Sequence, residues 1–244
     1  MKNEIKHKIV KQDGVKFGWK PVTVKPAIIS DGFFGMRGWQ EKAFDLLKND
    51  PHMILNAPMG SGKSWLMCLL SAYKMKKDGK LRAIFAVPQT IIANGFAEAN
   101  LVLPDGEKLH WFAQHDLCSE SPTEGTINYL IKFLEGPHGF FADRVLLCSQ
   151  ATLVAAYKRL KGEGRLGLLK DLMLWIDEAH HVKNAEAADY DGALLNNGIG
   201  EMVSYVLNHN NNVQLGLATA SFFRGDRCSL LTENMEKKFK RFNL

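Results

Sequence analysis

Short apolar runs alternate with amphipathic segments along most of the chain. Runs of this length are typical of strands buried in a parallel sheet, and apolar positions spaced three and four apart predict helices. The pattern predicts strands over residues 53–55, 83–87, 109–112, 145–148, 172–176 and 213–217. It predicts helices over residues 36–49, 64–77, 89–101, 127–134, 151–160 and 200–207. Strands that alternate with helices predict an α/β fold, a parallel sheet with helices on both faces.

The two ends of the chain depart from this pattern, so we expect a main domain over residues 31–227. Residues 1–30 are rich in lysine, and Gln12-Asp13-Gly14 predicts the turn of a small hairpin. This basic arm is expected to be solvated, and contact of its lysines with nucleic acid is the alternative. Residues 228–244 are expected to form a helix or linker, with the helix over residues 236–242.

A glycine-rich turn joins the first predicted strand to the helix after it and ends in Gly-Lys-Ser. Gly60 and Gly62 can adopt backbone conformations that bring N–H groups close to phosphate oxygens, and the helix N-terminus favours an anion. Lys63 can reach the β- and γ-phosphates of a nucleotide, and the Ser64 hydroxyl can bind Mg²⁺. The pattern therefore predicts an ATP site formed by Ala57, Pro58, Met59, Gly60, Ser61, Gly62, Lys63 and Ser64.

Two carboxylates follow the strand predicted over residues 172–176. Ligands bind at the carboxyl ends of the strands in open α/β sheets, so Asp177 and Glu178 are expected beside the phosphates. Asp177 can hold Mg²⁺, and Glu178 can orient or deprotonate the attacking water. Arg37 and Gln40 lie three apart at the start of the first helix and project from one side. The Gln40 amide can read the edge of adenine.

Composition adds little that is specific. The net charge of +5 is compatible with a polyanionic partner. The four cysteines are widely spaced and contain no Cys-x-x-Cys pair, which argues against zinc or a disulfide framework and favours the cytoplasm. No apolar stretch approaches the length of a transmembrane helix, so no membrane partner is expected.

At this point the order of motifs resembles that of superfamily 2 helicases and translocases. Asp177-Glu178-Ala179-His180 resembles the DEAH box of that superfamily. Further segments resemble its adenine motif, motif I, motif Ia, the threonine-containing motif and motif III: residues 37–40, 57–64, 87–90, 149–153 and 217–226. In the last, Ala218 and Ser221 replace the usual Thr and Pro. The features after the DEAH box leave the subfamily open between restriction-enzyme-type and chromatin-remodeller-like members.

The resemblance implies roles for particular residues and identifies the main domain as a first RecA-like domain. Lys63, Glu178 and His180 would serve catalysis, and Thr219 and Ser221 would couple ATP to motion. Nucleic acid, with DNA favoured over RNA, would contact Pro88, Gln89, Thr90, Gln150 and Thr152. ATP would lie against a second RecA-like domain, supplied in cis or by another chain.

We therefore expect an ATP-binding and hydrolysing domain of a nucleic-acid-dependent helicase or translocase, weak or inactive by itself. After Asp226 few residues remain, so the chain is expected to be a fragment, half of a split motor or a stand-alone domain. Two other classes stay open. One is a non-hydrolysing nucleic-acid-binding or sensor module. The other is a small-molecule kinase with the same loop, which gives no reason for the Asp-Glu-Ala-His sequence.

Overall fold

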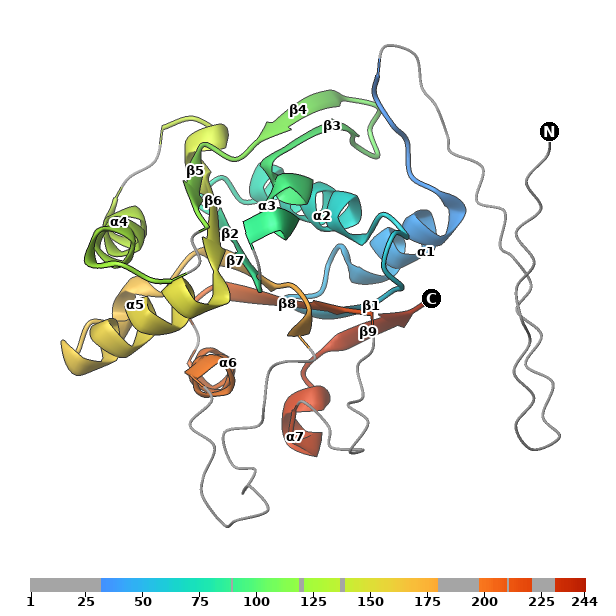
Figure 1. Ribbon diagram of the computed structural model, residues 1–244. Helices are drawn as coiled ribbons and strands as arrows, with labels where there is room; N and C mark the ends of the chain where they lie inside the picture. Colours follow the sequence, from blue (N-terminus) through green and yellow to red (C-terminus); the bar gives the residue numbers. More distant parts are fainter. Residues whose placement is uncertain are drawn as a thin grey trace, which may run out of the picture.

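The computed structural model describes residues 32–88, 90–118, 121–136, 139–179, 198–209, 211–220 and 231–244, with only the backbone of 90–92. One sheet contains strands β1 (His52–Asn56), β2 (Arg82–Val87), β5 (His115–Leu117), β6 (Val145–Ser149), β7 (Leu172–Ile176), β8 (Val213–Thr219) and β9 (Lys240–Asn243). Their order is β5-β6-β2-β7-β8-β1-β9, and every neighbouring pair is parallel (Figure 1). Because the strands are parallel, their carboxyl ends meet at one edge.

Helices cover both faces of this sheet (Figure 1). One face packs on α1 (Gly38–Leu47), α2 (Lys63–Lys77) and α3 (Thr90–Ala97), and the other on α4 (Glu124–Glu135), α5 (Gln150–Gly162) and α6 (Gly198–Asn208). The remaining helical elements are short: α7 (Glu233–Glu236) and the 3₁₀ turns η1 (Ala142–Arg144) and η2 (Leu166–Leu168). The predicted fold class, a parallel sheet with helices on both faces, is confirmed.

Successive residues of each strand enter opposite layers of the core. Met53 and Leu55 of β1 pack with α2, whereas Ile54 packs in the layer of α5 and α6. Trp175 of β7 is fully buried, and its indole N–H donates to Ser71 Oγ at 2.8 Å. A Cβ atom at Gly216, its partner on β8, would lie 2.1 Å from the indole ring. The glycine is thus needed for the large side chain to fit beside the strand.

The prediction of one helix over residues 89–101 is wrong in its second half. Helix α3 ends at Ala97, and β3 (Glu98–Val102) pairs antiparallel with β4 (Lys108–Phe112). Packing decides this, because Trp111 of β4 is fully buried and its indole N–H donates to the Phe96 carbonyl at 2.8 Å. The strand over 109–112 was predicted, but its partner was assigned to the helix.

The C-terminal residues also differ from expectation. The predicted helix over residues 236–242 is wrong: α7 ends at Glu236, and β9 adds an edge strand beside β1. The ring of Phe242 stacks on Trp39 of α1 with 6.1 Å between centroids, and this contact favours the extended chain. Residues 115–117, where no strand was predicted, form the opposite edge strand β5.

Two further predictions concern the N-terminal arm and membranes. The hairpin expected within residues 1–30 lies outside the described residues. Among the helices that the structure describes, none is long and apolar enough to cross a membrane.

Candidate active site

The turn between β1 and α2 forms an open cradle of backbone N–H groups. Gly60 and Gly62 have positive φ angles of 73° and 93°, in the left-handed region that favours glycine. Helix α2 begins at Lys63, and Leu66 N–H is the donor to the Gly62 carbonyl at 3.3 Å. The N–H groups before Leu66 therefore lack an intrahelical acceptor. Ser61 Oγ is shielded from solvent and has no hydrogen-bond partner among the described residues. These groups suit an anion.

An acidic pair at the end of β7 faces this cradle. Lys63 Nζ lies 3.2 Å from Glu178 Oε1 and 3.8 Å from Asp177 Oδ1. Lys63 and Asp177 are 7% and 3% exposed. Glu178 has a φ of 50°, a strained conformation for a residue with a side chain. Thus β1, α2 and β7 bring a buried ammonium and two carboxylates together at the carboxyl edge of the sheet, as predicted for Lys63, Asp177 and Glu178.

These residues fit the triphosphate of ATP with a divalent cation. The unpartnered Ser61 hydroxyl and the Lys63 ammonium can both donate to phosphate oxygens. The residues able to hold Mg²⁺ are Ser64 and Asp177. In the part of the chain that the structure describes, no group of three or more His, Cys, Asp or Glu side chains could hold a metal ion. A cation here would therefore share its coordination with phosphates and water, which is usual for Mg²⁺.

Arg37 and Gln40 contact the phosphate loop directly. Gln40 Nε2 donates to the Gly62 carbonyl at 3.0 Å, and Arg37 Nη1 donates to the Ser61 carbonyl at 2.9 Å. Gln40 Oε1 also accepts the backbone N–H of Arg37 at 2.8 Å, and Gln40 is only 3% exposed. Both ends of the amide are thus used within the protein. That Gln40 reads the edge of adenine stays a prediction. The contact of Gln40 with the phosphate loop was not indicated by the sequence spacing.

The start of α5 is tied to the acidic pair rather than open to solvent. Gln150 Nε2 donates to the Asp177 carbonyl at 2.7 Å. Thr152 is fully buried, and its hydroxyl lies 2.9 Å from Ser149 Oγ, which caps the helix. The prediction that Thr152 contacts nucleic acid conflicts with this burial, because a hydroxyl inside the helix cap cannot reach an external phosphate. Gln150 instead fixes the backbone just before Glu178.

The remaining predicted residues are only partly described. Pro88 is half-buried after β2, whereas Gln89 and the side chain of Thr90 lie outside the described residues. Thr219 is fully buried at the end of β8, and its carbonyl accepts the N–H of Ala57 at 3.0 Å. This contact joins the segment predicted for coupling to the first residue of the phosphate loop. His180 and Ser221 also lie outside the described part of the chain.

Comparison with known sequences matches this chain to a protein family. The family model described as type III restriction enzyme, res subunit, matches residues 33–224. The chain is also similar to YeeB of Bacillus subtilis (strain 168), named as a candidate ATP-dependent helicase. The two are 26% identical over 212 residues, which cover 84% of this chain and 31% of YeeB. The chain thus spans about a third of the length of that relative.

Three solved structures share the fold. The helicase domain of Hef from Pyrococcus furiosus has a TM-score of 0.52 at 14% identity, covering 84% of this chain and 37% of that one. The DUF1998 helicase MrfA bound to DNA has a TM-score of 0.51 at 14% identity, covering 85% and 27%. A nuclease-deletion mutant of the type ISP restriction-modification enzyme LlaGI, in complex with a DNA substrate mimic, has a TM-score of 0.51 at 14% identity, covering 86% and 20%.

Proposed function

Since the chain belongs to the family of the type III restriction enzyme res subunit and forms a first RecA-like helicase domain, we propose that it hydrolyses ATP to drive movement on nucleic acid. The observation that carries this proposal is the contact of Lys63 with both Asp177 and Glu178 across the phosphate cradle. A loop that only bound phosphate would need the lysine but not two converging carboxylates. The proposal includes a second RecA-like domain, in cis or from another chain, as the other wall of the site.

Each residue of the site has a separate task in this mechanism. Lys63 exchanges its carboxylate partner for phosphate oxygens, and Glu178 Oε1 accepts a proton from the attacking water. Asp177 and Ser64 would hold Mg²⁺, which would supply positive charge to offset that of the phosphates. Gln150 keeps the Asp177 carbonyl in place at 2.7 Å, so the backbone that carries Glu178 cannot rotate freely.

Replacement of Lys63 by alanine is expected to weaken ATP and ADP binding about 10- to 100-fold, because a charge-assisted contact contributes about 1.5–3 kcal/mol. Calorimetric titration with Mg²⁺ present measures this. The matched control is Lys76→Ala, on the exposed far end of the same helix, where the lysine pairs with Asp105 and Glu107. Unchanged nucleotide affinity in Lys63→Ala would refute the assignment of the loop.

Nucleic acid is the proposed second ligand, with DNA favoured over RNA. Two of the similar structures contain DNA, and this supports a DNA partner for the present chain without identifying its contacts. We place the contact at Pro88, Gln89 and Thr90, after β2 at the carboxyl edge of the sheet. Thr152 is removed from the predicted set because it is buried.

Binding to backbone phosphates is expected to be sequence-tolerant and to weaken as salt rises. Each phosphate neutralised on single-stranded nucleic acid should contribute a slope of about −0.7 in log affinity against log salt. Fluorescence anisotropy with labelled DNA and RNA at several salt concentrations tests both statements. Affinity that ignores salt, or that needs one defined sequence, contradicts the proposal.

The two rival functions predict different results in an ATPase assay with and without nucleic acid. A non-hydrolysing module would bind nucleic acid but would show no turnover even with a second RecA-like domain. A kinase would consume ATP only with its small-molecule acceptor. Turnover that depends on nucleic acid distinguishes the proposed motor from both.

The cysteines support a cytoplasmic setting for this proposal. Cys68, Cys118 and Cys148 are free thiols in the structure. Burial raises the pKa of Cys68 and Cys148, which keeps both thiols protonated and unreactive. Thiols of this kind are usual in proteins of a reducing compartment.

A further inference from the structure

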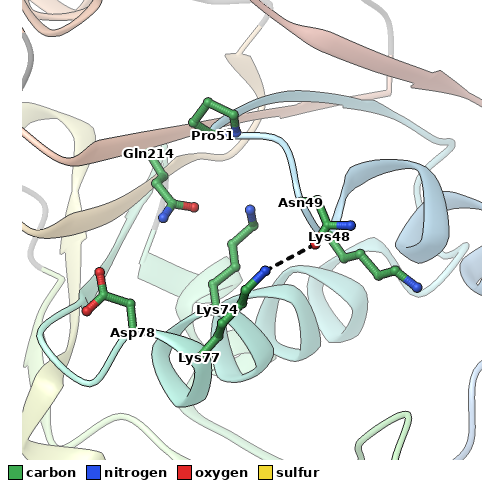
Figure 2. A pocket seen from close by; sticks show the side chains of 7 residues that line it. All are labelled: Lys48, Asn49, Pro51, Lys74, Lys77, Asp78 and Gln214. Atoms are coloured by element: carbon green, nitrogen blue, oxygen red, sulfur yellow. Dashed lines mark hydrogen bonds between the residues drawn. The ribbon is translucent and has the colours of Figure 1, made fainter.

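A basic pocket lies at the amino-terminal edge of the sheet, at the opposite end of the strands from the phosphate cradle (Figure 2). Its volume is about 290 Å³. Pro51 precedes β1, Lys74 and Lys77 lie on the last turn of α2, and Gln214 is the second residue of β8. Its lining consists of Lys48, Asn49, Pro51, Lys74, Lys77, Asp78 and Gln214. Nothing in the proposed ATPase mechanism uses these residues.

Two ammonium groups in this pocket lack a carboxylate partner. Lys74 Nζ donates to the Asp50 backbone carbonyl at 2.7 Å, and Lys77 Nζ donates to Asn49 Oδ1 at 3.4 Å. Among the described residues, no carboxylate oxygen lies within 4.0 Å of either ammonium. Figure 2 shows both lysines extending into the pocket.

The other charged residues of the lining compensate these two ammonium groups only in part. Lys48 is paired with Asp45 at 2.6 Å. The Asp78 carboxylate accepts from Asn212 Nδ2 at 3.1 Å and from the Lys80 N–H at 3.0 Å. Since Lys48 is paired with Asp45 and the hydrogen bonds of Asp78 leave its charge in place, the two ammonium groups outnumber the one remaining carboxylate of the lining.

Burial and nearby charges together lower the pKa values of two groups beside the pocket. Burial lowers the pKa of Lys74 to about 8; the Asp50 carboxylate acts in the opposite direction, and Lys77 lowers the pKa further. Burial, with Lys238 and Lys74, lowers the pKa of His52 to about 4. A bound anion would relieve the repulsion that both groups show.

Gln214 adds to the pocket a hydrogen-bond acceptor that lacks a donor. Its side-chain amide extends toward the pocket (Figure 2), and Oε1 is shielded from solvent with no hydrogen-bond partner among the described residues. A shielded acceptor without a donor costs about 1–3 kcal/mol. The pocket thus presents donors for an anion and one acceptor that still needs a donor.

We propose that this pocket binds a hydrogen phosphate group, either the free ion or the terminal phosphate of a nucleic-acid strand, which loses its second proton at about pH 6 and binds here as its protonated monoanion. Lys74 and Lys77 donate to the charged oxygens, and the P–OH group donates to Gln214 Oε1. Sulfate has the same shape but carries no proton near neutral pH, so it leaves Gln214 unpaired. The volume of about 290 Å³ suits one phosphate group with water and is at the lower limit for a larger ligand.

Calorimetric titration of Lys63→Ala protein with inorganic phosphate and with sulfate, at equal ionic strength, tests this proposal. The Lys63→Ala change removes the phosphate loop as a competing site. We expect phosphate to bind about tenfold more tightly than sulfate, which corresponds to one satisfied hydrogen bond. Adding Lys77→Gln should weaken both anions, whereas adding Gln214→Leu should lower phosphate affinity to that of sulfate.

The matched control is Lys80→Gln, which removes an exposed lysine three residues beyond Lys77 and outside the pocket lining. It should leave both affinities unchanged. Equal affinity for phosphate and sulfate in the Lys63→Ala protein would overturn the proposal, as would a phosphate affinity that Lys77→Gln leaves unchanged. Thermal melting of each variant checks that the fold is intact.

The two sources of phosphate are distinguished by competition. An oligonucleotide with a 5′-phosphate that displaces phosphate better than its 5′-hydroxyl counterpart identifies the strand terminus as the ligand. Equal, weak displacement by both oligonucleotides identifies the free ion. Either result supports the site, and weaker binding of that ligand in both Gln214→Leu and Lys77→Gln ties it to these residues.

Discussion

Addition of a second RecA-like domain is expected to raise ATP hydrolysis by residues 1–244 about 10³- to 10⁵-fold, the range that an arginine finger contributes. The described arginines of this chain have other partners. Arg37 holds the Ser61 carbonyl, and Arg82 holds the carbonyls of Phe133, Leu134 and Lys170 on the far side of the sheet. Arg144, Arg159, Arg165 and Arg241 bond carbonyls or carboxylates away from the phosphate cradle. None is placed to neutralise the transferred phosphate.

The measurement is a steady-state ATPase assay of the chain by itself, then with the second domain fused or added separately, each with and without DNA. Removal of the arginine of the added domain should return turnover to the low level. Fast turnover by residues 1–244 without any addition would contradict the proposal that a second RecA-like domain completes the ATP site. It would require an arginine from this chain or from a second copy.

In the two-domain protein, replacement of Glu178 by glutamine is expected to lower turnover about 10²- to 10⁴-fold, because it removes the general base. ATP affinity should stay the same or rise. Glu178 Oε1 lies 3.2 Å from Lys63 Nζ, so the carboxylate competes with phosphate for the ammonium, and a neutral amide competes less. The separation of these two effects is the signature of the proposed role.

Single-turnover hydrolysis and nucleotide titration measure the two effects separately. Glu163→Gln is the matched control, since Glu163 lies at the end of α5 and pairs with Arg165. It should change neither quantity. Equal loss of binding and turnover in Glu178→Gln would indicate that Glu178 only supports the loop.

The buried part of the fold could be predicted because its pattern is local. The strand predicted over residues 172–176 matches β7 exactly in extent, since an apolar run in a covered sheet carries its own signal. The polar sequence of β9 carries no such local signal for a strand. Lys240–Asn243 is a strand because β1 offers an open edge and Phe242 packs on Trp39. Likewise, β3 is a strand because of its pairing with β4.

In the candidate active site, too, local sequence patterns could be predicted and contacts between distant segments could not. The Gly-Lys-Ser turn and the acidic pair follow strands in sequence, and the structure brings them together as predicted. Side-chain contacts between distant segments could not be predicted from spacing. Gln40 bonds Gly62 and Gln150 bonds Asp177, each across a gap in sequence that only the folded sheet closes. Burial of Thr152 was missed because its role as part of a helix cap depends on Ser149.

The position of β1 between β8 and β9 has a consequence for the time course of folding. The strand that leads into the phosphate cradle gains both neighbours only from the last third of the described chain, and Asn56 and Asn243 are 187 residues apart. At about 5–20 residues per second, the ribosome needs about 10–40 s to make this interval. Until β8 has been made, β1 has no partner on either side, and its second partner β9 comes at the end of this interval. The phosphate cradle therefore forms late among the described elements, and a nascent chain gains its nucleotide site only after β8 and β9 have been made.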